Sequence, residues 1–166
     1  PMLYFATVHK EISSGIMVTA SHNPAGDNGF KSVLAGNTLT SEGVQAIYQT
    51  IVSNQFLHGD GMLTSHDILP EYSRAITDRI VLDRPLKVVV DSGNGVGAIA
   101  GPGVLKQLGC EVIELYSEID GRFPNHHPDP TVKKNLQDLI QEVKRTGADC
   151  GLAFDGDADR LGVVTN

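Results

Sequence analysis

GLAFDGDADRLG, residues 151–162, is the stretch that decides the fold. It contains most of an apolar run, 150–154, then carboxylates at every second position, and it leads into a second apolar run, 161–164. Short apolar runs bounded by glycine and aspartate are typical of buried strands. We therefore predict that Asp155, Asp157 and Asp159 follow the end of one strand and that Arg160 precedes the next.

The spacing of these carboxylates predicts a metal site. Alternate residues of an extended segment face the same side, so the three can converge. At about 5 Å and an effective dielectric constant of about 20, each pair repels by roughly 3 kcal/mol. One arginine cannot offset three such pairs, whereas Mg²⁺ can, and it prefers carboxylate oxygens. The alternative is a solvated acidic turn with its side chains apart. A calcium EF-hand is excluded, because Arg160 and Asn166 stand where that loop needs glycine and glutamate.

Outward from this stretch, residues 84–166 alternate strand and helix. Strands are predicted over 86–90, 111–116 and 150–154, and a helix over 96–108 with a bend or restart at 101–103. A further helix, capped by Thr131, carries the apolar stripe Val132, Leu136, Leu139, Ile140 and Val143. This alternation favours a parallel sheet covered by helices, in which ligands gather at the carboxyl ends of the strands.

Residues 1–83 are less regular. Residues 3–8 are expected to form a strand or the start of a helix, and residues 15–20 and 30–34 to form strands. Helices are predicted after a cap at Thr40 or Ser41 and over 68–81. The sequence Asp83-Arg84-Pro85 then marks a predicted domain boundary.

Composition narrows the function classes. The net charge of −7 over 166 residues argues against a nucleic-acid partner, which would need a basic face. No apolar stretch approaches the ~20 residues of a membrane span. The two cysteines, Cys110 and Cys150, are predicted to be buried thiols in a reducing, cytoplasmic compartment. The chain opens at Pro1 without an initiator methionine and closes directly after a predicted strand, so both ends are expected to be cuts within a longer protein.

A second candidate site follows the predicted strand 15–20. Ser21 stands at the mouth of a loop rich in glycine and asparagine, whose backbone N–H groups can hold phosphate oxygens. A serine hydroxyl needs activation, and adjacency alone does not pair it with His22. The G-x-S-x-G elbow and the P-loop pattern are both absent. From the residues alone we expect a serine loop and a divalent-metal loop for phosphoryl transfer, with Lys31 and Arg160 supplying countercharge.

Several motifs together resemble a known family. TASHNP (19–24), NGFK (28–31) and DGDADR (155–160) resemble the α-D-phosphohexomutase superfamily. FPNHHPDP (123–130) and DSGNG (91–95) resemble its bacterial phosphomannomutase/phosphoglucomutase branch. The resemblance covers essentially the whole chain, in the family's order. It implies an α/β protein of two three-layer α/β/α domains with mixed or mostly parallel sheets, over residues 1–83 and 84–166, the first domain incomplete.

The resemblance also implies site residues. Ser21 matches the serine that donates a phosphoryl group to a sugar phosphate and takes one back, while a bisphosphorylated sugar reorients between the two steps. Asp155, Asp157 and Asp159 match the Mg²⁺ ligands, with an oxygen of phosphorylated Ser21 completing the set. The matching catalytic residues are Ser21, Lys31, His22 and Arg160. The implied substrates are the 1- and 6-phosphates of mannose or glucose. Phosphoglucosamine mutase and a non-catalytic metal- or anion-binding module remain the alternatives.

The sequence departs from the family in extent and at one loop position. Full family members have four domains, and this chain matches the later part of the first and most of the second. The remaining domains are therefore expected partners, and the chain alone is expected to be inactive. Ala158 replaces a glycine often found in the metal loop, which is costly if that position needs a positive φ. His126, His127 and Asp129 are expected to form a rigid proline-flanked loop rather than a transition-metal site, and Gly93 and Gly95 to serve turn geometry.

Overall fold

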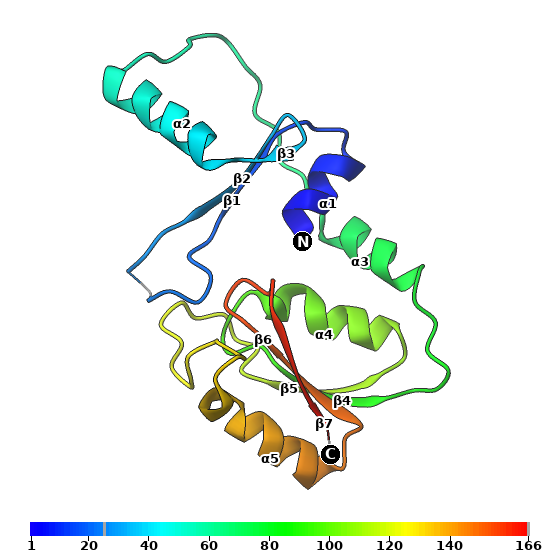
Figure 1. The fold of residues 1–166 in the computed structure, drawn as a ribbon. Coiled ribbons are helices and arrows are strands. Elements are labelled where there is room, and N and C mark those ends of the chain that lie inside the picture. The colour runs from blue at the N-terminus through cyan, green and yellow to red at the C-terminus, as the bar shows by residue number, and fades with distance from the viewer. Residues whose placement is uncertain (25, 166) are drawn as a thin grey trace. The chain divides into compact units, whose positions relative to one another are not determined.

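The computed structural model describes residues 1–24 and 26–165, whose contacts form two compact units (Figure 1). The first unit comprises residues 1–18 and 30–68. The second comprises residues 19–29 together with the chain from residue 69 onward. The serine loop thus belongs to the second unit, although it lies early in the sequence. The predicted boundary after residue 83 differs from this division over residues 69–83.

The second unit is built on a four-stranded sheet. Its strands are β4 (Lys87–Asp91), β5 (Glu111–Leu115), β6 (Cys150–Phe154) and β7 (Leu161–Thr165), in the order β5-β4-β6-β7. β4 pairs parallel with β5 and β6, and β7 returns antiparallel to β6. All four strands fall where the apolar runs predict them. The mostly parallel sheet is confirmed for this unit.

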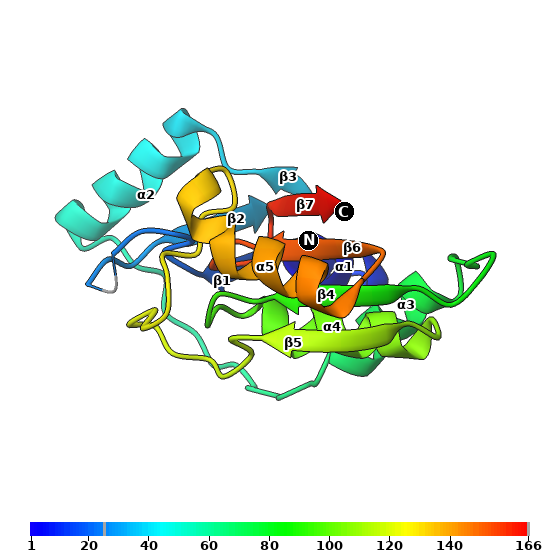
Figure 2. The same cartoon turned by 90° about the horizontal axis from the view of Figure 1, so that it is seen from below.

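Helices cover both faces of this sheet. α5 (Gln137–Thr146) packs on one face through a buried cluster that contains Val89, Leu139 and Val143. The other face carries a second cluster, around Val88 and Val90, against which Leu105 of α4 (Gly97–Gln107) packs. α3 (Leu69–Thr77) packs in turn against α4. Figures 1 and 2 show the resulting three layers. Burial on both faces explains why β4 and β6, at the centre of the sheet, are continuous apolar runs.

The strand order brings two loops together. The chain moves from β4 outward to β5 and then crosses back to place β6 on the other side of β4. Asp91, the last residue of β4, pairs in register with Ala153, two positions before Asp155. The loops after β4 and β6 therefore lie side by side at the carboxyl edge, where the strand order reverses. Open α/β sheets bind ligands at such a reversal.

The structure differs from local predictions at three helices of this unit. The helix after Thr131 begins with a 3-10 turn, η1 (Lys133–Leu136), before α5, and the Thr131 hydroxyl donates to Asp129 rather than capping a helix. α4 runs through Pro102 without a restart. The helix predicted over 68–81 is α3, which ends at Thr77.

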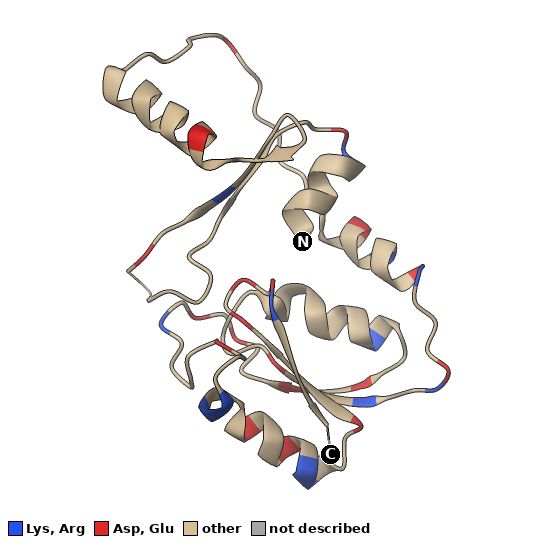
Figure 3. Ribbon diagram, in the orientation of Figure 1, with Lys and Arg blue, Asp and Glu red and all other residues tan. Residues whose placement is uncertain are grey.

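The charges of α5 suit its dipole, with acidic residues toward its start and basic ones in its last turn (Figure 3).

The first unit contains α1 (Met2–His9), β1 (Gly15–Val18), β2 (Phe30–Leu34), β3 (Asn37–Thr38) and α2 (Ser41–Ser53). Residues 3–8 are therefore helical. Thr40 caps α2 as predicted, accepting a hydrogen bond from the Gly43 N–H at 3.3 Å. The strands form an antiparallel sheet in the order β1-β2-β3, so no parallel pair occurs among the described residues of this unit. The α/β class is confirmed, but the side chains of β1 are mostly exposed rather than buried.

The described helices are short or polar compared with membrane-spanning helices. Among residues 1–24 and 26–165, none of them combines the length and the apolar character needed to cross a bilayer.

Candidate active site

The acidic loop, residues 155–160, joins β6 to β7 and folds around the carboxylate of Asp155. That carboxylate is fully buried. Its Oδ1 accepts backbone N–H groups from Asp159 at 3.0 Å and from Arg160 at 3.1 Å. The Asp155 N–H donates in return to the carbonyl of Arg160 at 3.2 Å. Because buried polar groups require partners, these bonds determine the shape of the loop.

The three carboxylates converge as predicted, although residues 156–159 form turns and bends rather than the extended segment on which the prediction relied. One oxygen from each of Asp155, Asp157 and Asp159 lies within 4.8 Å of the other two. The guanidinium Nε of Arg160 lies 2.9 Å from Asp155 and 4.0 Å from Asp159. A single guanidinium leaves surplus negative charge, which a hard divalent cation would neutralise. The oxygen-only donor set therefore fits a metal such as Mg²⁺.

Ala158 occupies the loop position where a glycine is common in the family. Its φ is 58°, in the left-handed region, so this position has the positive φ that makes a residue other than glycine costly. An alanine there costs about 1 kcal/mol more than a glycine. Its N–H still donates to the Asp155 carbonyl at 3.0 Å. The turn therefore closes with an alanine at this position.

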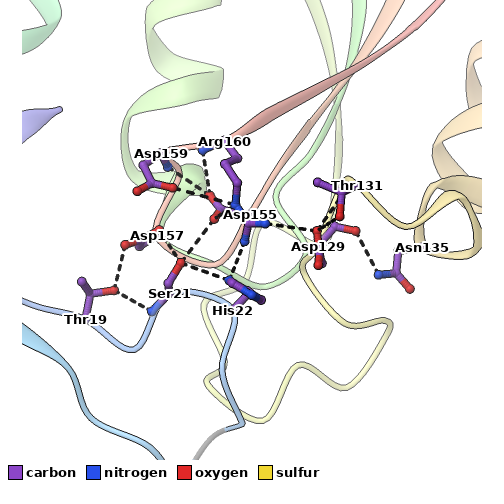
Figure 4. A network of polar contacts seen from close by, with 10 residues as sticks. All are labelled: Thr19, Ser21, His22, Asp129, Thr131, Asn135, Asp155, Asp157, Asp159 and Arg160. Carbon is purple, nitrogen blue, oxygen red and sulfur yellow. Dashed lines mark hydrogen bonds and ion pairs between the residues drawn. The ribbon is translucent and has the colours of Figure 1, made fainter.

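Ser21 lies against the acidic loop (Figure 4). Its Oγ is 3.0 Å from Asp157 Oδ1 and 3.4 Å from Asp155 Oδ2, across a separation of more than 130 residues. Its φ of 56° is left-handed, which is uncommon for serine. Strain of this kind concentrates at functional sites, because the surrounding structure must hold it. The structure thus brings the predicted nucleophile and the predicted metal ligands into one site.

Two residues hold the serine loop on the acidic loop, and the sequence did not single out either. The Thr19 hydroxyl donates to Asp157 Oδ2 at 3.1 Å and accepts the Ser21 N–H at 2.9 Å. Gly156 lies so close to the Ser21 carbonyl that a Cβ at position 156 would overlap its oxygen. On its other side, the Gly156 carbonyl accepts the N–H of Val96 at 3.1 Å. The acidic loop is therefore packed between two other segments.

Glycine is required at position 95 for a different reason from the predicted turn geometry. The φ of Gly95 is not positive, whereas Gly93 has a φ of 51° and fits the turn role. A Cβ on Gly95 would lie 2.8 Å from the Gly156 carbonyl oxygen. Close approach of two backbones, rather than turn geometry, explains this glycine.

Arg160 and His22 are joined across the same two loops. Guanidinium Nη2 lies 2.5 Å from His22 Nδ1, and Nη1 lies 3.4 Å from Asp129. A guanidinium only donates, so His22 Nδ1 accepts and the ring proton is on Nε2. The Ser21 hydroxyl is 3.3 Å from this same Nδ1. Because that nitrogen is occupied, His22 shapes the serine loop rather than serving as a free base for Ser21.

Lys31 is a predicted site residue, but it belongs to the first unit, whereas Ser21 and the acidic loop belong to the second. It lies on β2 of the first unit, opposite Met17, and is half-buried. Its proposed part in catalysis stays a prediction.

Among the described residues, the group that could hold a metal ion is the aspartate trio, and the loop 123–130 contributes no residue to it. His126 instead contacts Asp91 through Nε2 at 2.9 Å. Asp129 joins Arg160, a pairing that no local pattern signals because 31 positions separate the two. The local signal at Asp129 is only that of a turn, which it forms with the N–H of Thr131.

The chain matches two models of one known protein family. Residues 1–58 match the family model described as phosphoglucomutase/phosphomannomutase, alpha/beta/alpha domain I, and residues 70–166 match alpha/beta/alpha domain II. The chain belongs to the phosphoglucomutase/phosphomannomutase family. The two matches also bear out the order of motifs on which the resemblance rests.

Relatives within this family are similar along the whole chain. A phosphomannomutase/phosphoglucomutase of Pseudomonas aeruginosa is 54% identical over 100% of this chain and 36% of its own length. A phosphoglucomutase of Neisseria meningitidis is 51% identical over 99% of this chain and 36% of its own length. The crystal structure of a Burkholderia thailandensis family member superposes with a TM-score of 0.89 at 51% identity, covering 92% of this chain and 33% of that one. The chain thus spans about a third of the length of these relatives.

Proposed function

We propose that this chain carries the phosphoryl-transfer site of a Mg²⁺-dependent mutase, which interconverts the 1- and 6-phosphates of mannose or glucose. The observation that supports it is the contact of the Ser21 hydroxyl with Asp157 and Asp155, two members of the acidic trio. A hydroxyl beside a metal-binding set is the arrangement that phosphoryl transfer requires. The names of the relatives agree with this chemistry.

Each residue has a role that follows from its surroundings. Ser21 carries the phosphoryl group, and Asp155, Asp157 and Asp159 hold the cation, which when bound withdraws charge from the phosphoryl oxygens. In one half-reaction the bond from Ser21 Oγ to phosphorus breaks while a sugar hydroxyl oxygen bonds to phosphorus. The proton of that sugar hydroxyl ends on Ser21 Oγ, so Ser21 is left as an alcohol. The second half-reaction reverses these steps on the other end of the sugar.

Arg160, His22 and Lys31 complete the proposed site. Arg160 anchors Asp155 and His22 and keeps about a third of its side chain exposed, so part of its guanidinium can face a phosphate. His22 accepts from that guanidinium and fixes the loop on which Ser21 stands. Lys31 is proposed to stabilise charge on the sugar or to take part in moving its proton.

The rest of the proposed enzyme lies outside this chain. The parts of the relatives that the chain does not span are proposed to bind the sugar, so the chain alone is expected to be inactive. A phosphoglucosamine substrate, or a non-catalytic metal- or anion-binding module, would be the alternatives. The unbonded thiols of Cys110 and Cys150, which share one core cluster, support a cytoplasmic location.

The direct test is the mass of the purified intact protein. We expect the mass of one added phosphate on Ser21. This phosphate should be lost from the protein when glucose 1-phosphate or mannose 1-phosphate is supplied, because the phosphoryl group is transferred to the sugar phosphate. Glucosamine 1-phosphate in a parallel reaction separates the substrate alternatives. Protein that never carries phosphate on Ser21, even after incubation with a bisphosphorylated hexose, would contradict the proposal.

The metal assignment has its own test. Mg²⁺ at about 100 times its dissociation constant stabilises a protein by about 2.7 kcal/mol, a melting shift on the order of 5 °C. Asp157→Asn removes one charge from the trio and should abolish most of that shift. Asp60→Asn, at an exposed position of the first unit, is the matched control and should keep it. An equal Mg²⁺ response in all three proteins would rule out the aspartate trio.

A further inference from the structure

A buried acid–histidine pair lies beside the candidate site without belonging to it. Asp91 ends β4 and has 1% of its side chain exposed, and His126 has 15% exposed. Nε2 of His126 is 2.9 Å from Asp91 Oδ2, and the other carboxylate oxygen accepts the Gly93 N–H at 2.9 Å. The described residues place neither side chain within the aspartate trio or against Ser21. The pair therefore needs an explanation other than catalysis.

The hydrogen bonds of His126 define its charge. Its Nδ1 lies 3.0 Å from the backbone carbonyl of His127, while its Nε2 faces the Asp91 carboxylate. A carbonyl oxygen only accepts, and so does an ionised carboxylate. Both ring nitrogens must then donate, and only the imidazolium form has two N–H groups. The surroundings thus fit a charged histidine at this position.

The groups packed around His126 are compatible with a positive charge on its ring. The ring of Tyr116 meets it edge to face with centroids 5.4 Å apart, and the Tyr116 hydroxyl donates to Asp138 at 2.7 Å. That hydrogen bond raises the pKa of Tyr116 to about 12, so the tyrosine stays neutral over the working range. Gly93 makes room for the histidine, since a Cβ there would lie 3.3 Å from His126 Cε1.

The same loop leads directly to the candidate site. The His127 carbonyl that contacts His126 also accepts the N–H of Asp129 at 2.8 Å. Asp129 holds Nη1 of Arg160 at 3.4 Å, and the ring of His127 lies edge to face with the ring of His22 at 6.2 Å. Between them Pro128 is fully buried. A displacement of His126 would therefore be transmitted to Arg160 and His22.

We propose that His126 is a positioning residue, which Asp91 holds as an imidazolium. The charged His126 keeps the loop 126–129 in place. In that place Asp129 orients Arg160, and His127 orients His22. Deprotonation of His126 releases one of its two hydrogen bonds and loosens that loop. The consequence for turnover rests on the proposed function, whereas the charge state of His126 does not.

The sign of the pH dependence follows from the pair. The hydrogen bond with Asp91 raises the pKa of His126 above its ordinary value, against the opposing effect of burial, and the His127 carbonyl and Asp138 also raise it. A raised pKa in the folded state means that the stabilisation is complete below about pH 6.5, the unfolded value. It is lost as the pH rises through the raised pKa.

The charge is tested by NMR on the intact protein labelled with ¹⁵N at histidine. His126 is assigned by the signal missing from His126→Gln. We expect two ring N–H groups at neutral pH, a titration midpoint above that of a free imidazole, and a lower midpoint in Asp91→Asn. A neutral His126 at pH 7, or a midpoint that Asp91→Asn does not lower, would overturn the proposal.

The positioning role is tested by kinetics, provided that Ser21 is confirmed as the phosphoryl carrier. His126→Gln should lower kcat about tenfold with a smaller change in KM, as outer residues that orient a site commonly do. In the unchanged protein, kcat should decline as the pH rises through the titration midpoint of His126. In His126→Gln this decline should be absent. His58→Gln, at an exposed position, should leave kcat unchanged. Unaltered kcat and pH profile in His126→Gln would overturn the role, and if that variant does not fold, the pH profile of Asp91→Asn decides in the same way.

Discussion

Ser21→Ala is expected to lower the mutase turnover of the intact protein by at least about 10³-fold, because the proposed phosphoryl carrier is lost and the neighbouring Thr19 hydroxyl is already held between Asp157 and the residue 21 N–H. The Ser21 Oγ is the atom that contacts both Asp155 and Asp157. Alanine also tolerates the left-handed φ of 56° about as well as serine does, so the loop should keep its shape. The measurement is kcat with glucose 1-phosphate, together with the mass of the variant.

Two comparisons make this result specific. Ser65→Ala, at an exposed position of the first unit, should retain full turnover and phosphate on Ser21. Ser21→Ala should still gain stability from Mg²⁺, since the aspartate trio is intact. Turnover of Ser21→Ala close to that of the unchanged protein would show that the phosphoryl group takes another route.

The second large effect is expected for Gly156→Ala. A Cβ there would overlap the carbonyl oxygen of Ser21 and lie 3.0 Å from its carbonyl carbon. The acidic loop cannot retreat, because the Gly156 carbonyl accepts the Val96 N–H and lies against Gly95. The serine loop must therefore move away from the aspartates. A displacement of about 1 Å can cost about 10²-fold in rate, and forcing a packed region apart costs about 1–3 kcal/mol.

Kinetics and urea unfolding of the same variant separate these two costs. Gly103→Ala is the matched control, because a Cβ at that position of α4 meets no atom within 4 Å and an alanine favours the helix. It should leave kcat unchanged and the stability equal or slightly higher. Normal kcat in Gly156→Ala would mean that the two loops need not touch during the reaction.

Prediction from sequence succeeded where the signal is local. The apolar runs that became β4, β5, β6 and β7 are each buried on two faces or bounded by turn residues, so a few neighbouring positions determine them. It failed at helix boundaries, where tertiary contacts compete with local preference. Thr131 has the side chain of a cap, yet its hydroxyl is taken by Asp129, and the chain continues as a 3-10 turn. Pro102 is tolerated inside α4, where it is buried.

For the site, the sequence by itself determined the chemistry of each half. Carboxylates at alternate positions after a strand can converge, and a serine in a polar, glycine-rich loop is accessible, because both features depend on backbone geometry over a few residues. Only the tertiary structure decided that these halves meet, that Thr19 and Gly156 hold them together, and that Asp129 contacts Arg160. The physical reason is that such contacts depend on the order of strands in the sheet and on which loops it brings to one edge, and no short stretch of the chain encodes that order.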